Sequence, residues 1–162
     1  KDIIKVRLTF EDERYVNNYY KLAVKVGKTL TDSIIVNGSL IVDTTKAYSW
    51  LKIYKDHSIL ESTITNKETI FNDNTFNGSN FSIDFSIKDI IKKINNTDNI
   101  NLDFIELYFY NINSSLYNYH KSINNYSDNN SNPFAQPIQV FSNIQNGFGI
   151  FSGANLNVVK LY

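Results

Sequence analysis

The sequence predicts a mainly β fold, an antiparallel β-sandwich with one or two short helices; a partly closed β-barrel is the alternative. Apolar and polar residues alternate with a period of two through much of the first half. Asn-Gly pairs and other turn signals separate these runs at short intervals, as in sandwiches and barrels. A chain of 162 residues, 14% of them aromatic, can bury one sizeable core, so we expect residues 1–162 to form a single all-β domain.

The first three strands are predicted from alternation and from one turn. Residues 6–10 place their apolar side chains at even positions, and residues 20–26 do the same in a strand expected to stop at Gly27. Residues 33–42 form two β-rich runs around Asn37-Gly38. Asn-Gly between such runs is the strongest short hairpin signal, because both residues tolerate positive φ.

Further strands follow along the rest of the chain. We expect them at residues 50–54, 59–65, 68–71, 81–85 and 102–110. Gly147 and Gly149 then introduce a final strand or hairpin that extends to Tyr162.

Two helices interrupt the strands. Four isoleucines between residues 87 and 94 have helical spacing behind a capping-box pattern at Ser86 and Asp89, although they could equally enter a strand. Ser114 is the expected N-cap of the second helix. The apolar stripe of that helix is predicted at Leu116, Tyr119, His120, Ile123 and Tyr126. Residues 124–132 are polar and are predicted to form a mobile loop.

Composition argues against several classes of function. Sixteen basic residues balance sixteen acidic ones, so the chain lacks the electrostatic footprint of a nucleic-acid-binding protein. Cysteine is absent, which excludes disulfides, thiolate catalysis and zinc–sulfur sites. The apolar runs are a few residues long, whereas a membrane helix needs about 20. No cofactor is expected.

One segment has the spacing of a metal site. Asp73, Thr75, Asn77, Gly78 and Asp84 fit the ligand positions of a calcium loop loosely. Strand-like sequence follows the glycine, however, where the calcium motif has a helix. A plain Asn-Gly turn is the favoured interpretation.

Catalytic residues are not indicated. His57 and His120 are the two histidines, and neither lies in a recognisable catalytic signature. Glu11, Asp12 and Glu13 lie at a strand end, where a charge cluster is usually solvated. We therefore expect a protein that is not an enzyme, and a hydrolase is the least favoured hypothesis.

An aromatic surface is the remaining candidate site. Tyr48, Trp50 and Tyr54 share one strand parity, so their rings could form a platform for a sugar or a protein partner. The same parity is equally typical of a second packed face of a sheet, which is the favoured interpretation.

The C-terminal part carries a recognisable pattern. Residues 132–151 contain Asn-Pro-Phe-Ala-Gln-Pro and, after a short spacer, Ser-Asn-Ile-Gln-Asn-Gly-Phe-Gly-Ile-Phe. This pattern resembles the closing signature of the DUF4249 family. The positions that carry the resemblance are Asn132, Pro133, Phe134, Pro137, Asn143, Gly147, Gly149 and Phe151. They have a structural interpretation, since the glycines permit positive φ and the prolines fix extended chain.

The resemblance implies a location rather than a chemistry. Members of the family are Bacteroidota proteins, typically outer-membrane lipoproteins encoded near TonB-dependent receptors, and they have no established catalytic residues. They carry an N-terminal lipid anchor and an immunoglobulin-like region, so the chain is expected to be the C-terminal domain of a longer lipoprotein. Any membrane attachment is expected through that anchor alone, which this chain lacks.

Two functional hypotheses follow. The first is a non-enzymatic accessory or binding module at the cell surface or the periplasmic face, working beside a TonB-dependent receptor or a secretion complex. The second is a glycan- or peptide-binding module that uses the aromatic strand face. No nucleic-acid partner is expected in either case.

Overall fold

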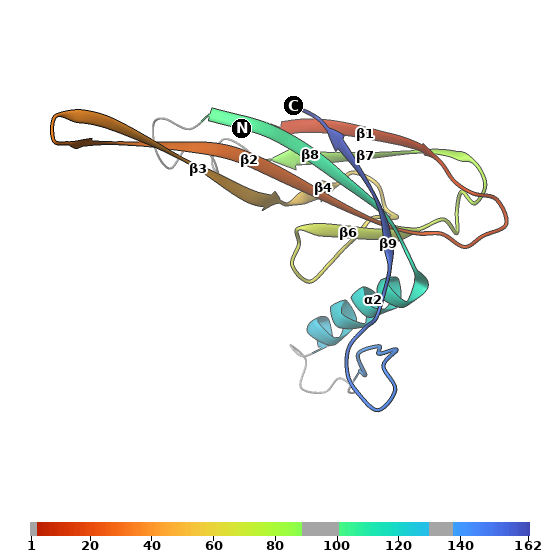
Figure 1. Cartoon of the computed structure of the whole chain (residues 1–162). Coiled ribbons are helices and arrows are strands. Elements are labelled where there is room, and N and C mark those ends of the chain that lie inside the picture. The colour runs from red at the N-terminus through yellow and green to blue at the C-terminus, as the bar shows by residue number, and fades with distance from the viewer. Residues whose placement is uncertain (1–2, 89–100, 130–137) are drawn as a thin grey trace.

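In the computed structural model, the described residues are 3–88, 101–129 and 138–162 (Figure 1). Their strands form two separate antiparallel sheets, and both sheets contribute side chains to one hydrophobic core. This arrangement confirms the β-sandwich and decides against a single closed sheet. No helix in the described part of the chain has both the length and the apolar composition needed to cross a bilayer.

The smaller sheet has three strands in the order β1 (Ile3–Glu11), β7 (Asn80–Lys88) and β4 (Ile53–Lys55). The predicted alternation of β1 is confirmed, because Val6, Leu8 and Phe10 pack against the core. On the opposite face, the Arg7 guanidinium donates two hydrogen bonds to Asp84, at 2.7 and 2.8 Å. This contact lowers the pKa of the Asp84 carboxyl.

The larger sheet has six strands around the long strand β2 (Tyr19–Val36). In spatial order the path is β5 (Glu61–Ser62), β6 (Glu68–Asn72), β2, β8 (Asn101–Ile112) and β9 (Ala154–Lys160). The sixth strand, β3 (Ser39–Leu51), pairs with β2 from Val24 onward. The predicted strand over 59–65 is therefore reduced to the two residues of β5, and the run over 50–54 is divided between β3 and β4.

The core lies between the two sheets and is rich in rings at one end. Phe10 of β1 packs against Tyr20 of β2, Phe71 of β6 and Phe109 of β8, with ring centroids 4.9–6.2 Å apart. Such contacts add about 0.5–1.5 kcal/mol per pair beyond the burial of area. Rings from both sheets therefore hold the layers together where the loop between β1 and β2 begins.

Strand β2 does not stop at Gly27, which corrects the sequence prediction. Glycine fits the strand because the Phe104 ring covers it: a Cβ built on Gly27 would lie 2.2 Å from Phe104 Cε1. The pairing of β2 with β8 shifts register between Gly27 and Lys28. Gly27 therefore lies where the Phe104 ring packs closely against the backbone and where the β2–β8 pairing is irregular, not at the end of the strand.

The helix α2 (Ser114–Asn129) confirms one predicted helix but corrects its details. The N-cap is Asn113 rather than Ser114, because the Asn113 Oδ1 accepts the Leu116 N–H at 3.0 Å. The buried ring is Tyr117, which lies outside the predicted stripe, whereas Tyr126 of that stripe is exposed. The helix extends through residues 124–129, so the loop predicted over 124–132 is wrong for that part.

Most of the other predicted helix, which begins at Ser86, lies outside the described residues. Ser86 and Ile87, its first residues, belong to β7. Asp89, Ile90, Ile91 and Ile94 lie outside the described residues, as do positions 130–132 of the predicted loop.

Candidate functional site

Beyond Thr29, the last β2 residue that pairs with β8, β3 is the one strand among the described residues that pairs with β2. We call residues 30–45 the β2–β3 arm. Figure 1 shows the arm projecting beyond the other strands as a two-stranded ribbon. Residues 31–45 are all exposed, so the arm presents side chains of both faces to the surroundings.

The tip of the arm is apolar. Its six large apolar side chains are between 43% and 75% exposed, and they are Ile34, Ile35, Val36, Leu40, Ile41 and Val42. Contiguous apolar patches of this kind are uncommon on monomeric proteins and mark sites of interaction. The tip is therefore the leading candidate for a contact surface.

The turn of the arm fixes this apolar tip in one register. Asn37 and Gly38 have φ values of 50° and 79°, and Val36 pairs with Ser39 across them. Two successive positive φ values are those of the two-residue type I′ turn, whose twist matches the flanking strands. The predicted Asn-Gly hairpin is confirmed.

An acidic pair lies at the base of the tip. Asp32 of β2 and Asp43 of β3 are directly opposite each other in the register, and both are exposed. In an antiparallel pair, directly opposite residues point to the same face of the ribbon. Two carboxylates therefore lie side by side next to the apolar tip.

Two of the three candidate platform residues lie together on an outward face, which corrects the favoured interpretation of a second packed face. Tyr48 and Trp50 of β3 lie on the face of the larger sheet that points away from the core, and Tyr48 is 55% exposed. Trp50 meets Tyr108 of β8 edge to face, with ring centroids 5.2 Å apart. The Lys25 Nζ lies 4.4 Å from the Tyr48 ring centroid and 5.9 Å from that of Tyr108.

Polar groups surround these rings. The Tyr108 hydroxyl donates a hydrogen bond to the Glu106 carboxylate at 3.1 Å. Desolvation raises the pKa of Tyr108, and this hydrogen bond raises it further. A hollow of about 190 Å³ beside Trp50 is lined by Thr65, Lys67 and Glu68. Rings next to charged groups suit a polar ligand with an apolar face.

The third predicted platform residue belongs elsewhere. Tyr54 lies on β4 of the smaller sheet, where its ring is approached by Lys88 at 4.5 Å and Lys52 at 5.5 Å. The break at Lys52 between β3 and β4 transfers the chain from one sheet to the other. The shared parity of the three aromatic residues therefore does not give a shared platform.

The acidic run at the end of β1 is not uniformly solvated, which corrects another expectation. Asp12 is only 3% exposed. Its carboxylate accepts hydrogen bonds from the Tyr20 hydroxyl and from the Gly78 N–H, the second at 2.8 Å. Desolvation raises the pKa of Tyr20, and the contact with Asp12 raises it further.

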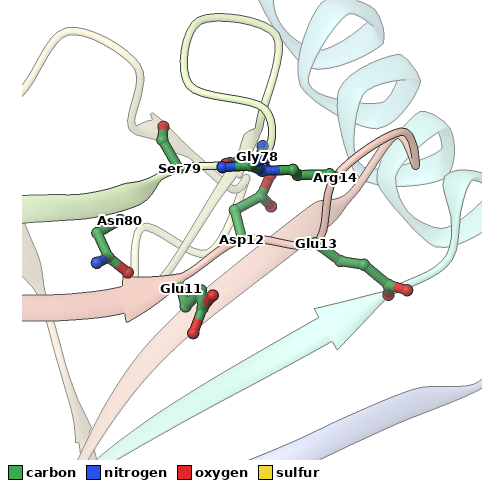
Figure 2. A pocket seen from close by; sticks show the side chains of 7 residues that line it. All are labelled: Glu11, Asp12, Glu13, Arg14, Gly78, Ser79 and Asn80. Carbon is green, nitrogen blue, oxygen red and sulfur yellow. The ribbon is translucent and has the colours of Figure 1, made fainter.

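Figure 2 shows how this carboxylate joins two loops. Asp12 points toward the loop that contains Gly78, whereas Glu11 and Glu13 point away from it. Arg14 crosses the same loop, and its Nε donates a hydrogen bond to the Gly78 carbonyl at 3.1 Å. The surrounding hollow measures about 680 Å³. Because both loops are fastened at Gly78, we interpret Asp12 as a structural residue.

The calcium-loop residues are used for other purposes. The Asp73 Oδ2 accepts the Asn18 N–H at 2.8 Å, and the Asn77 side chain donates to the Val16 carbonyl at 3.0 Å. Asp84 faces Arg7 on the smaller sheet. Within the described residues, no group of three or more His, Cys, Asp or Glu side chains is arranged to hold a metal ion. The plain Asn-Gly turn is the better interpretation of Asn77-Gly78.

The two histidines lie in separate places. The His57 ring packs edge-on against Phe81, with centroids 5.6 Å apart. His120 lies on α2, where desolvation lowers its pKa below the ordinary value. His57 follows β4 of the smaller sheet and packs against Phe81, whereas His120 is beside Tyr119 on α2, which contacts β2 of the larger sheet.

The signature segment is described from residue 138 onward. The Asn143 side chain donates to the Phe151 carbonyl at 2.7 Å and accepts the Phe151 N–H at 2.8 Å. Gly149 has a φ of 127°, which favours glycine, and a Cβ on Gly147 would lie 3.1 Å from Ile144. These contacts support the structural interpretation of Asn143 and the glycines. Asn132, Pro133, Phe134 and Pro137 lie outside the described residues.

Sequence reasoning identified the hairpin but missed its exposure. A signal was present: Ile34 to Val36 and Leu40 to Val42 are unbroken apolar triplets, so they place apolar side chains on both faces of a strand. No prediction was made from the sequence about the exposure of Phe151 and the neighbouring Phe148, which are 81% and 99% exposed.

The chain was also compared with known proteins. It matches the family described as "Domain of unknown function (DUF4249)" over residues 1–157. A comparison with the curated proteins gave no match, and neither did one with the solved structures. The family match covers almost the whole chain and confirms the resemblance first seen in residues 132–151. The chain therefore belongs to the DUF4249 family.

Proposed function

We propose that the chain is a binding module that docks onto a protein partner through the β2–β3 arm, and that it has no catalytic activity of its own. The apolar, uncovered tip of the arm is the observation that carries the proposal. Monomeric proteins usually protect exposed strands with charges, prolines or bulges. Here the four residues on each side of the turn, 33–36 and 39–42, contain no charge and no proline.

The free energy available at the tip supports docking. Full burial of a Val, Leu or Ile side chain contributes about 1.5–3 kcal/mol. The six tip side chains are about half exposed, so covering them completely would contribute roughly 5–9 kcal/mol. Association itself costs about 4–15 kcal/mol. The tip can therefore anchor a complex, while stable binding requires additional contacts from the arm's open backbone edges or its charges.

The proposed partner is a TonB-dependent receptor or a secretion complex of the outer membrane. This part of the proposal rests on the family membership and on the location expected for such proteins. In the same proposal, the full-length protein is a lipoprotein of the Bacteroidota cell envelope, held at the membrane by an N-terminal lipid anchor. The arm would then reach from the anchored protein to its neighbour.

The test is a mild-detergent purification of the full-length protein from its own outer membrane, followed by identification of stoichiometric partners by mass spectrometry. The arm variant Ile35→Ser/Leu40→Ser alters two exposed positions that pair across the ribbon. Phe148→Ser is the matched control, because it removes an even more exposed apolar side chain away from the arm. We expect the arm variant to lose the partner and the control to keep it. Retention of the partner by the arm variant would contradict the proposal.

A second candidate function is glycan binding on the platform formed by Tyr48, Trp50 and Tyr108. The observation that favours it is the grouping of these rings around Lys25 on an outward face of the sheet. Trp50 is the single tryptophan, so its fluorescence reports directly on this surface. A saturable change with one member of a glycan panel, absent in Tyr48→Ala, is the expected result. Unchanged fluorescence across the panel would refute glycan binding at this face.

A further inference from the structure

The arm also indicates the chemistry of the surface that receives it. Resting on the proposed docking function, we infer that the β2–β3 arm inserts into an apolar cleft on a protein partner, and that basic side chains line the rim of that cleft where Asp32 and Asp43 enter. The inference has two parts, the shape of the cleft and the charge of its rim.

The cleft follows from the distribution of apolar side chains over the two faces. Directly paired residues share a face, and successive pairs alternate between faces. Ile34 pairs with Ile41 on one face, and Ile35 pairs with Leu40 on the other. A hairpin that lies flat on a partner needs only one apolar face. Covering both faces requires a partner that surrounds the tip.

The basic rim follows from the acidic pair. Like charges directly opposite each other in a sheet are destabilising. Within residues 3–88, 101–129 and 138–162, the ion pairs are Arg7–Asp84, Lys21–Glu68 and Lys121–Glu61, so neither Asp32 nor Asp43 has an ion-pair partner there. Lys28, which is opposite Ala47, lies on the same face but four pairs further toward the body. The repulsion between the two carboxylates is therefore left for a partner to relieve.

The same pair argues for a protein over a lipid surface. An apolar hairpin tip could enter a bilayer, but membrane-active segments carry Lys or Arg beside their apolar residues, because these bind anionic lipids. The arm has carboxylates in that position, and an anionic surface repels them. A protein cleft with Lys or Arg at its rim complements both the apolar tip and its acidic base.

Photo-cross-linking in the native membrane tests the shape of the cleft. A diazirine amino acid is placed at position 34 in one full-length protein and at position 35 in another, so that the two probes point to opposite faces of the arm. We expect both probes to form adducts with the same partner protein, at peptides that mass spectrometry identifies as apolar. Adducts from one position only would mean flat docking and would overturn the cleft while leaving the proposed function intact. Adducts exclusively with lipid, or with a second copy of the chain, would overturn the inference in favour of those occupants.

Zero-length carbodiimide coupling tests the rim. This reagent joins a carboxylate to an amine in contact with it, so Asp32 or Asp43 should become linked to a partner lysine. Asp32→Asn/Asp43→Asn should abolish the linked peptide, lower partner recovery about fivefold at low salt, and weaken the salt dependence of binding. Glu11→Gln/Glu13→Gln, which changes two other exposed carboxylates, is the matched control and should change neither readout.

Asp32→Asn/Asp43→Asn is expected to weaken binding but to stabilise the arm itself. Removing the like-charge pair should stabilise the arm, which slower amide exchange at residues 31–44 would show. Weaker binding by a better-ordered arm cannot be attributed to misfolding. Unchanged partner recovery and salt dependence in this variant would overturn the inference of a basic rim. The docking function itself is tested separately, by whether Ile35→Ser/Leu40→Ser loses the partner.

Discussion

Removing the Tyr20 hydroxyl is expected to destabilise the whole domain, although the change is a single oxygen atom. The hydroxyl donates to the buried Asp12 carboxylate, which retains the Gly78 N–H as a donor at 2.8 Å. A hydrogen bond to a charged group contributes about 1.5–3 kcal/mol, and a buried acceptor that loses a donor is left partly unsatisfied. For Tyr20→Phe we therefore expect a loss of about 2 kcal/mol in the free energy of unfolding.

Urea denaturation followed by Trp50 fluorescence measures this loss, with the denaturant dependence expected to stay unchanged. Tyr15→Phe is the control, because Tyr15 is 96% exposed and a surface change of this kind stays within about 0.5 kcal/mol. If Tyr20→Phe lay within the same limit as the control, Asp12 would not depend on the hydroxyl, and our account of how the two loops are joined would be wrong.

Three further predictions concern pH, the Gly27 contact and the signature loop. Because the pKa of Tyr20 is raised above its ordinary value of 10.0, its contribution to stability is complete below pH 10 and is lost as the pH rises above that value. Urea unfolding followed by circular dichroism should therefore show the free energy of unfolding falling above pH 10, less steeply in Tyr20→Phe than in the wild type. An equal pH dependence in the two proteins would contradict this account. Gly27→Ala should lower the free energy of unfolding, measured by urea denaturation, by about 1 kcal/mol, because the new Cβ meets the Phe104 ring. In a Phe104→Ala background the same change should be neutral or stabilising, since only the entropic gain over glycine remains, and equal effects in the two backgrounds would refute the contact. Asn143→Ala should speed chymotrypsin cleavage after Phe151, since both backbone groups of Phe151 lose their partner. The control Gln145→Ala, at an exposed position of the same loop, should not, and equal cleavage rates in the wild type and Asn143→Ala would refute the role of the side chain.

The strands that form the core could be predicted because one face of each is buried. Alternation along β1, β7 and β8 indicates which side chains lie between the sheets. The residue types Asn37 and Gly38 indicate the positive φ values of their turn. These are local constraints, so they are visible in a single sequence. The helix α2 could be predicted for the same reason, although its cap lay one residue earlier than expected.

The remaining features depend on residues that are distant in the chain. Gly27 resembles a strand end until Phe104, far along the sequence, covers it. Asp12 resembles a solvated acid until Tyr20 and the loop at Gly78 enclose it. Tyr54 resembles a partner of Trp50 until the chain passes to the other sheet at Lys52. Contacts between residues far apart in the chain produce no periodic pattern in the sequence, so the predictions for Gly27, Asp12 and Tyr54 were wrong.

The length of β2 has a mechanical consequence. The strand runs unbroken from Tyr19, next to the helix α2, to Val36 at the tip of the arm. Eighteen residues at about 3.3 Å per residue make it roughly 60 Å long. A load applied to the tip is thus transmitted along one continuous backbone into the centre of the larger sheet, where β3, β6 and β8 hold the strand by lateral hydrogen bonds. A partner that binds the tip would therefore pull directly on the centre of the larger sheet.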